Sequence, residues 1–231
     1  MKSDIPLKEA YRIRPRDLLP LTGDTGARVV SAQSVPLPQS KREVDFVMRL
    51  RRGGEEYLRH IEFQTRHRGR LALRFFGYAS ALAVRSGLPV LTTVMYVVPP
   101  APRELTYRQV VSGRLTNEWR FGVLRLWELS PEQLLGLGPG GAALVPLSEE
   151  ASLPLVAAAS RKIQREVPLA RQPDLLAILQ VFAEGRYTAR QLARVIPEEV
   201  AMASGLFEKV VAKKRAEARA KIGRASCRER V

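Results

Sequence analysis

Two acidic side chains that suit a divalent metal ion lie on neighbouring segments of the chain, on either side of a tight turn. Asp45 belongs to the strand-like segment 42–51, and Glu62 belongs to the strand-like segment 56–66. The Gly53-Gly54 pair between them is typical of a β-hairpin turn. A two-residue turn at this pair, or any symmetric even turn about the same centre, places Asp45 opposite Glu62, with Cβ atoms roughly 4.5–5.5 Å apart.

Directly opposed carboxylates repel each other, which destabilises a hairpin and raises one of the two pKa values. A divalent cation between them removes the repulsion, and oxygen ligands that leave positions for water suit Mg²⁺ or Mn²⁺. Gln64 lies two residues beyond Glu62, hence on the same face, where its amide would position a water against a bound phosphate. The backbone carbonyl of Phe63 is a further candidate ligand. In the alternative interpretation, Asp45 and Glu62 only form salt bridges with nearby arginines.

Apolar and polar residues alternate along both segments. The expected apolar face contains Val44, Phe46, Met48, Leu50, Tyr57, Ile61 and Phe63, with Arg59 as the exception. The opposite face contains Glu43, Asp45, Arg49, Glu56, His60, Glu62 and Gln64. This alternation predicts a half-buried hairpin with its charged side facing solvent.

A helix predicted over 71–86 follows the hairpin and ends before Gly87. Arg74 and Tyr78 are one helical turn apart on one face of it, so both are candidate contacts for a phosphate near the metal. Arg42, before the first strand of the hairpin, is a third candidate. The alternative is that Tyr78 belongs partly to the core and the arginines face solvent.

The other elements give a strand–helix–strand order, which predicts a right-handed crossover and a mixed α/β sheet. A helix interrupted by Pro15 is expected over 7–21, and a flexible glycine-rich segment is expected over 138–141. Strands are expected over 27–35 and 90–98, with one or two more in 115–129 and a bend or bulge at Gly122. Helices are expected over 131–137, 152–166, 173–184, 188–195 and 198–220.

Basic residues dominate the charge of the chain. Its 231 residues contain 38 Lys and Arg against 23 Asp and Glu, a formal net charge of +15. Such a charge attracts polyanions and favours a nucleic-acid partner, with a solvated basic surface, a ribosomal contact or an anionic-lipid contact as alternatives. Two His and one Cys exclude a zinc site of the zinc-finger type. The charged segment 1–10 lacks the apolar core of a secretory signal, and no apolar run is long enough to span a bilayer, so a cytoplasmic protein without a membrane partner is expected.

The last ten residues, 222–231 (IGRASCRERV), match the translation of a common sequencing adapter in one frame. We therefore expect this segment to be an artefact and the native C-terminus to be missing. The alternative is a genuine basic tail.

A family resemblance is carried by the run from Val44 to Leu82, VDFVMRLRRGGEEYLRHIEFQTRHRGRLALRFFGYASAL. It resembles the recombination-promoting nuclease family, often labelled as transposases, within the PD-(D/E)XK nuclease superfamily. The family pattern is an Asp on one strand, a turn, a strand ending in hydrophobic-Glu-hydrophobic-Gln, and a helix with Arg and Tyr one turn apart. The residues here are Asp45, Glu62, Gln64, Arg74 and Tyr78. Segments 90–98 and 201–221 are also similar, so the resemblance covers most of residues 8–221.

The resemblance implies a restriction-endonuclease-like core over 8–130, a helical C-terminal region over 131–221, and Mg²⁺- or Mn²⁺-dependent cleavage of double-stranded DNA. Asp45 and Glu62 would bind the ion, whose role would be to activate water and to stabilise charge on the phosphate. Many superfamily members add an acidic residue from the first helix, for which Glu9 is the first candidate and Asp17 the second. Gln64 stands at the position of the Lys in the superfamily name. Because Gln is uncharged, the metal ion and nearby arginines would have to supply the positive charge that stabilises the transition state.

Three functions follow as expectations. The leading one is a DNA endonuclease that promotes recombination or belongs to a mobile element, and a homodimer is compatible with cleavage of both strands. The second is a catalytically silent DNA-binding protein with the same fold, and the third is a protein-interaction module that uses the C-terminal helices.

Overall fold

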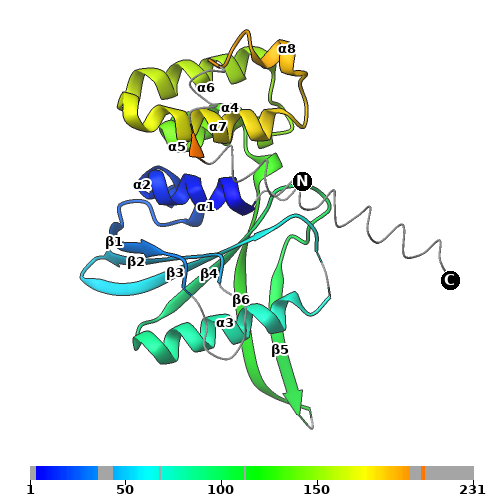
Figure 1. Cartoon of the computed structure of the whole chain (residues 1–231). Helices are drawn as coiled ribbons and strands as arrows, with labels where there is room; N and C mark the ends of the chain where they lie inside the picture. Colours follow the sequence, from blue (N-terminus) through cyan, green and yellow to red (C-terminus); the bar gives the residue numbers. More distant parts are fainter. Residues whose placement is uncertain (1–3, 36–43, 68, 112, 198–203, 206–231) are drawn as a thin grey trace, which may run out of the picture.

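The structure is a computed structural model that describes residues 4–35, 44–67, 69–111, 113–197 and 204–205. These residues form a six-stranded mixed sheet with helices on both faces (Figure 1). The predicted α/β class is therefore confirmed, and the predicted change to an all-helical texture after residue 130 is confirmed over 131–197. The helix expected over 198–220 lies almost wholly outside the described residues, and the segment 222–231 lies entirely outside them.

The sheet has the strand order β1-β2-β3-β4-β6-β5. The strands are β1 (Arg28–Gln33), β2 (Phe46–Arg52), β3 (Glu55–Gln64), β4 (Val90–Tyr96), β5 (Leu105–Val111) and β6 (Arg114–Arg125). β3, β4 and β6 run parallel, while β1, β2 and β3 form an antiparallel meander and β5 pairs antiparallel with β6. The carboxyl ends of β3, β4 and β6 therefore meet at one end of the sheet.

Helices close to the predicted ranges account for the remaining long elements. Those before residue 130 are α1 (Asp4–Ile13), α2 (Pro15–Leu18) and α3 (Leu71–Ser86). The later ones are α4 (Pro131–Gly136), α5 (Pro139–Ala142), α6 (Leu153–Glu166), α7 (Gln172–Ala183) and α8 (Ala189–Leu192), and short 3₁₀ turns join several of them. Pro15 separates the first two helices as expected, because its ring cannot continue α1 but suits the first turn of α2. Gly87 ends α3 in the left-handed conformation with φ 68°.

α3 forms the crossover between the parallel strands β3 and β4 and covers one face of the sheet (Figure 1). A buried cluster that includes Val47, Leu58, Phe75, Leu82 and Val94 fills the space between this helix and the sheet. The face of the hairpin that was expected to meet solvent is thus covered by a helix.

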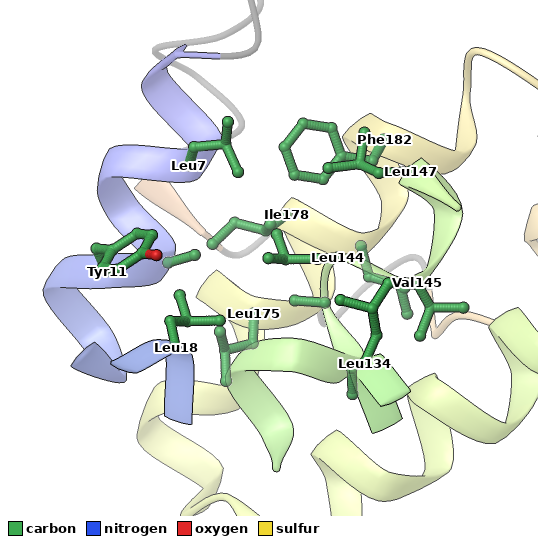
Figure 2. Close-up of a cluster of buried hydrophobic side chains, with 14 of the residues drawn as sticks. Leu7, Tyr11, Leu18, Leu134, Leu144, Val145, Leu147, Leu175, Ile178 and Phe182 are labelled. Atoms are coloured by element: carbon green, nitrogen blue, oxygen red, sulfur yellow. The ribbon is translucent and has the colours of Figure 1, made fainter. Parts of the chain in front are cut away.

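The opposite face packs against α1 and α2, which lie between the sheet and the C-terminal helices (Figure 1). Leu7 and Leu18 point from α1 and α2 toward Ile178 and Leu175 of α7 (Figure 2), whereas the Tyr11 ring packs against Phe46 and Phe63 of the sheet. One buried cluster therefore contains residues of the sheet, of α1 and α2, and of the helical region. The described parts of 8–130 and 131–221 share a core.

Two predictions about glycines were wrong. The segment 138–141 was expected to be flexible, but α5 begins within it and Gly141 is buried against the backbone carbonyl of Leu134. Gly122 was expected to bend or bulge β6, and the bulge was wrong, because residues 122–125 keep a regular register with β4. A Cβ at Gly122 would lie 3.0 Å from Thr93 Oγ1, so the glycine allows close packing of the two strands.

β5 was not predicted. This edge strand is largely exposed and lacks the alternation that marks a half-buried strand, so its sequence carries little local signal. Its pairing with β6 extends a two-stranded ribbon away from the body of the molecule (Figure 1).

Candidate active site

The hairpin has the register that the glycine pair predicts. Gly53 and Gly54 both have positive φ, 58° and 87°, as a two-residue hairpin turn requires. Arg52 pairs with Glu55, and the ladder continues to Phe46 opposite Ile61. The next position along the two chains holds Asp45 and Glu62.

Hydrogen bonds tie these two acidic residues together. The backbone N–H of Asp45 donates to Glu62 Oε1 at 3.3 Å, and the backbone N–H of Phe63 donates to Asp45 Oδ2 at 2.9 Å. The structure therefore brings Asp45 and Glu62 to one place, at the open end of the β2–β3 ladder. Because N–H and C=O of one strand residue point to the same edge, the Phe63 carbonyl also points to the edge where Asp45 lies.

Burial beneath α3 distinguishes Glu62 from a surface carboxylate. Glu62 is 3% exposed and the neighbouring His60 is fully buried, so the expectation that this face meets solvent was wrong at these two residues, while Arg49 on the same face is exposed. His60 Nε2 lies 3.0 Å from Glu62 Oε1, and His60 Nδ1 lies 3.1 Å from Thr92 Oγ1. The imidazole is held from both sides and fixes one oxygen of Glu62, as ligand carboxylates in metal sites are commonly fixed.

Asp45 is balanced from the other side by α1. Lys8 Nζ lies 2.9 Å from Asp45 Oδ1. Burial raises the pKa of Asp45 above its ordinary value, and the negative charge of Glu62 raises it further, while Lys8 and the Phe63 N–H act in the opposite direction. The pair thus concentrates negative charge, which a cation stabilises.

Arg74, at the start of α3, is the nearest arginine to Glu62 that the contacts identify. Its Nη2 lies 3.9 Å from Glu62 Oε2, and its Nε is buried without a hydrogen-bond partner among the described residues. Tyr78 is largely buried, with its ring 5.9 Å from the Arg74 guanidinium carbon and 6.3 Å from the His60 ring. The packing alternative is therefore favoured for Tyr78, while Arg74 keeps an unused donor beside the carboxylates.

Gln64 is half-buried at the end of β3, opposite Tyr96 of β4. The Tyr96 hydroxyl lies 2.8 Å from His67 Nδ1, and burial raises the pKa of Tyr96 to about 12 although Arg74 acts in the opposite direction. The loop that follows Gln64 carries Arg66 and Arg70 on the surface. Basic and hydrogen-bonding groups thus surround the carboxyl ends of these strands.

The acidic residues of the first helices do not join the pair. Glu9 accepts hydrogen bonds from Arg12 at 2.9 and 3.0 Å, and Asp17 accepts from Arg14 and from the backbone of Gly140. In the described part of the chain, no group of three or more His, Cys, Asp or Glu side chains is arranged to hold a metal ion. The expected ligand role of Glu9 is therefore not supported, and Arg42 lies outside the described residues.

Sequence reasoning missed Lys8 and His60. His60 lies two residues before Glu62, so strand alternation already placed it on the same face, but its burial depends on α3. No local sequence pattern could indicate the role of Lys8, because its contact with Asp45 joins residues 37 positions apart. A helical wheel shows that Lys8 and Glu9 point about 100° apart, which explains why only one of them meets Asp45.

Comparison with protein-family models, with curated proteins and with solved structures finds no match. No helix among the described residues combines the length and apolar character that crossing a membrane requires. The case for a function therefore rests on the geometry of the site and on the resemblance.

Proposed function

We propose that this chain is a Mg²⁺- or Mn²⁺-dependent endonuclease that hydrolyses phosphodiester bonds of double-stranded DNA. The observation that carries the proposal is the pair of carboxylates, Asp45 and Glu62, held side by side and largely buried at the end of the β2–β3 ladder. Opposed like charges destabilise a hairpin, and a cation bound between the two carboxylates would offset their repulsion.

The oxygen donors at this place fit the ion. Mg²⁺ keeps several waters and is commonly bound by one or two carboxylates together with substrate phosphates, so two carboxylates suffice. Asp45 and Glu62 would hold the ion, with the Phe63 carbonyl on the same edge. The bound ion would supply a Lewis acid for the phosphate and a lower pKa for a water.

The surrounding residues would orient the groups that react. His60 fixes Glu62, and the Phe63 N–H fixes Asp45, so both carboxylates are preorganised. Arg74 Nε is a buried donor without a partner among the described residues, a position that a phosphate oxygen would satisfy. Gln64 would hold a water on the same face.

The order of elements also supports the proposal. β2, β3, α3 and β4 follow one another in the order of the pattern that resembles the recombination-promoting nucleases. The formal net charge of +15 suits a polyanionic substrate. The proposal can be extended to a role in recombination or in a mobile element, and to a homodimer. These extensions rest on the resemblance alone.

Cleavage of supercoiled plasmid DNA by the purified chain and by Glu62→Gln tests the proposal. We expect nicking in Mg²⁺ or Mn²⁺ and none in EDTA. We expect Glu62→Gln to slow nicking more than roughly 100-fold, because metal sites supply several kcal/mol of transition-state stabilisation. Glu118→Gln is the matched control, since this exposed β6 residue forms surface ion pairs with Arg108 and Arg120, away from the candidate site.

A chain that binds DNA but nicks nothing in either metal would overturn the proposal. Equal nicking by the wild type and Glu62→Gln would instead show that the activity lies elsewhere. Melting curves of both variants verify that each one is folded.

A catalytically silent DNA-binding protein is the second candidate, and Lys8 favours it. The ammonium group of Lys8 already neutralises Asp45 at 2.9 Å, where a cation would bind. Lys8→Met separates the candidates. If the site binds Mg²⁺, removal of the competing cation should tighten Mg²⁺ binding several-fold, measured by calorimetry without DNA. If the site is silent, neither protein should show Mg²⁺ binding.

A further inference from the structure

A basic cavity lies next to the candidate active site, on the face of the sheet that α3 covers. It has a volume of about 260 Å³ and opens between β1–β3 and the C-terminal half of α3. Val47, Leu58 and Leu82 contribute apolar walls, and Arg49 and Arg85 contribute positive charge. Every other described lining residue is apolar or an uncharged Ser or Gln, so the described part of the wall holds no acidic side chain.

Residues of β2 and of the segment after β1 that line the cavity are close to Asp45 along the chain or through hydrogen bonds. Val47 lies two residues after Asp45 and therefore on the same face of the strand. Val35, another lining residue, accepts a hydrogen bond from the Val44 N–H at 3.2 Å, and Ser34 Oγ donates to the Asp45 carbonyl at 3.0 Å. The near wall of the cavity thus adjoins Asp45.

The two arginines of the cavity lie at a distance from the carboxylates that a DNA backbone can span. Arg49 is four strand residues from Asp45, about 13 Å. Arg85 is eleven helical residues from Arg74, about 16 Å, and returns to nearly the same face of α3. Arg74 beside Glu62 and Arg85 beside the cavity therefore mark two points along one helix.

The charge near Arg49 remains positive although it is paired. Glu56 accepts hydrogen bonds from both Arg49 and Arg51. One carboxylate shared by two guanidinium groups leaves one net positive charge among these three residues, and the opposite wall of the cavity carries a further guanidinium group, that of Arg85. Buried apolar walls lower the local dielectric constant, which strengthens the attraction of an anion to these charges.

We propose that this cavity is a second phosphate subsite, which binds a backbone phosphate of the DNA strand a few nucleotides from the bond that is cleaved. The inference rests on the proposed function for its substrate. It adds a named anchor, Arg49 with Arg85, that sets where the strand lies relative to Asp45 and Glu62. DNA is favoured as the occupant because the described lining contains two guanidinium groups and no acidic residue, and because the lining residue Val47 is two positions from Asp45 on the same face of β2.

The test is DNA binding by Arg49→Gln/Arg85→Gln, measured by fluorescence anisotropy in EDTA over a range of salt concentrations. Loss of one phosphate contact should reduce the slope of log K against log [salt] by about 0.9, and affinity should fall at low salt. The control is Arg108→Gln/Arg120→Gln, which removes the same amount of positive charge from the β5–β6 ribbon. It should respond to a neutralised phosphate in the same way as the wild type.

Duplexes with a single uncharged methylphosphonate at successive positions locate the contact. One position should weaken binding by the wild type and by the ribbon variant, and the same position should have no effect on Arg49→Gln/Arg85→Gln. Equal responses of all three proteins at every position would overturn the subsite, as would an unchanged salt slope in the cavity variant.

Binding in EDTA needs no cleavage, so the two proposals fail separately. A wild type that never nicks DNA but shows the position-specific loss refutes the nuclease and keeps the subsite. A wild type that nicks DNA without that loss keeps the nuclease and refutes the subsite.

Discussion

Asp24→Asn should lower the free energy of unfolding by about 3–5 kcal/mol, because it leaves the guanidinium of Arg59 buried without its charged partner. Arg59 donates to Asp24 through Nε at 2.5 Å and Nη2 at 2.7 Å, and both residues are buried. Tyr57 and Thr22 donate to the same carboxylate at 2.6 and 2.5 Å. This cluster explains why Arg59 interrupts the apolar face of β3.

Chemical unfolding at pH 7 measures the loss of free energy. In thermal unfolding, the melting temperature of the variant should fall by roughly 10 °C. Glu166→Gln is the matched control, since Glu166 forms only solvent-screened pairs with Lys162 and Arg165 on α6, and its substitution should have a much smaller effect on stability. The double variant Asp24→Asn/Arg59→Met should recover part of the loss. A cost for Asp24→Asn no larger than that of Glu166→Gln would contradict the prediction.

The same carboxylate makes a prediction about pH. Burial by itself raises the pKa of Asp24, but hydrogen bonds from Arg59, Thr22 and Tyr57 outweigh it and lower the pKa below the ordinary 3.8. The unfolded state therefore binds the proton more readily, and the stabilising contribution is complete above about pH 4 and lost as pH falls through the folded-state pKa. The stability gap between wild type and Asp24→Asn should therefore narrow as pH falls through the folded-state pKa of Asp24.

Asp45→Asn should have effects of opposite sign with and without metal. Without metal, the substitution removes the repulsion between Asp45 and Glu62, and the amide oxygen can still accept from the Phe63 N–H. Loss of the Lys8 contact partly offsets that gain. The metal-free variant should therefore be as stable as the wild type or more stable by up to about 1 kcal/mol.

With metal, the order should reverse. A free Mg²⁺ concentration of ten times Kd should stabilise the wild type by about 1.4 kcal/mol, and this gain should be absent in Asp45→Asn, together with DNA nicking. Thermal melting of both proteins in EDTA and in Mg²⁺ checks the result. Equal stabilisation of both proteins by Mg²⁺ would remove Asp45 from the metal site.

Local patterns in the sequence were sufficient for the hairpin and its register. Because Gly53 and Gly54 tolerate positive φ, they set a two-residue turn, and a two-residue turn leaves one way to pair the strands. Asp45 therefore meets Glu62 for a reason that lies within 18 consecutive residues. The α3 helix, its end at Gly87 and the buried strand β4 were equally local, since their apolar spacing and terminal residues decide them.

The tertiary structure alone decided what surrounds that pair. Alternation predicted an exposed charged face, but the crossover helix between parallel strands must pack on the sheet, and it buries Glu62 and His60. Whether Lys8 or Glu9 contacts Asp45 depends on the rotation of α1 about its axis. The packing of α1 against α7 and the sheet sets this rotation. The same holds for the buried Gly141, whose neighbours are brought together only by packing of the helices.

The chain by itself thus determined which residues carry the candidate chemistry and which of them face one another across a turn. Their burial, their partners and the basic cavity beside them were decided by contacts between residues far apart in sequence. Such contacts leave no periodic signal, because periodicity reports only which side of an element is covered and not what covers it.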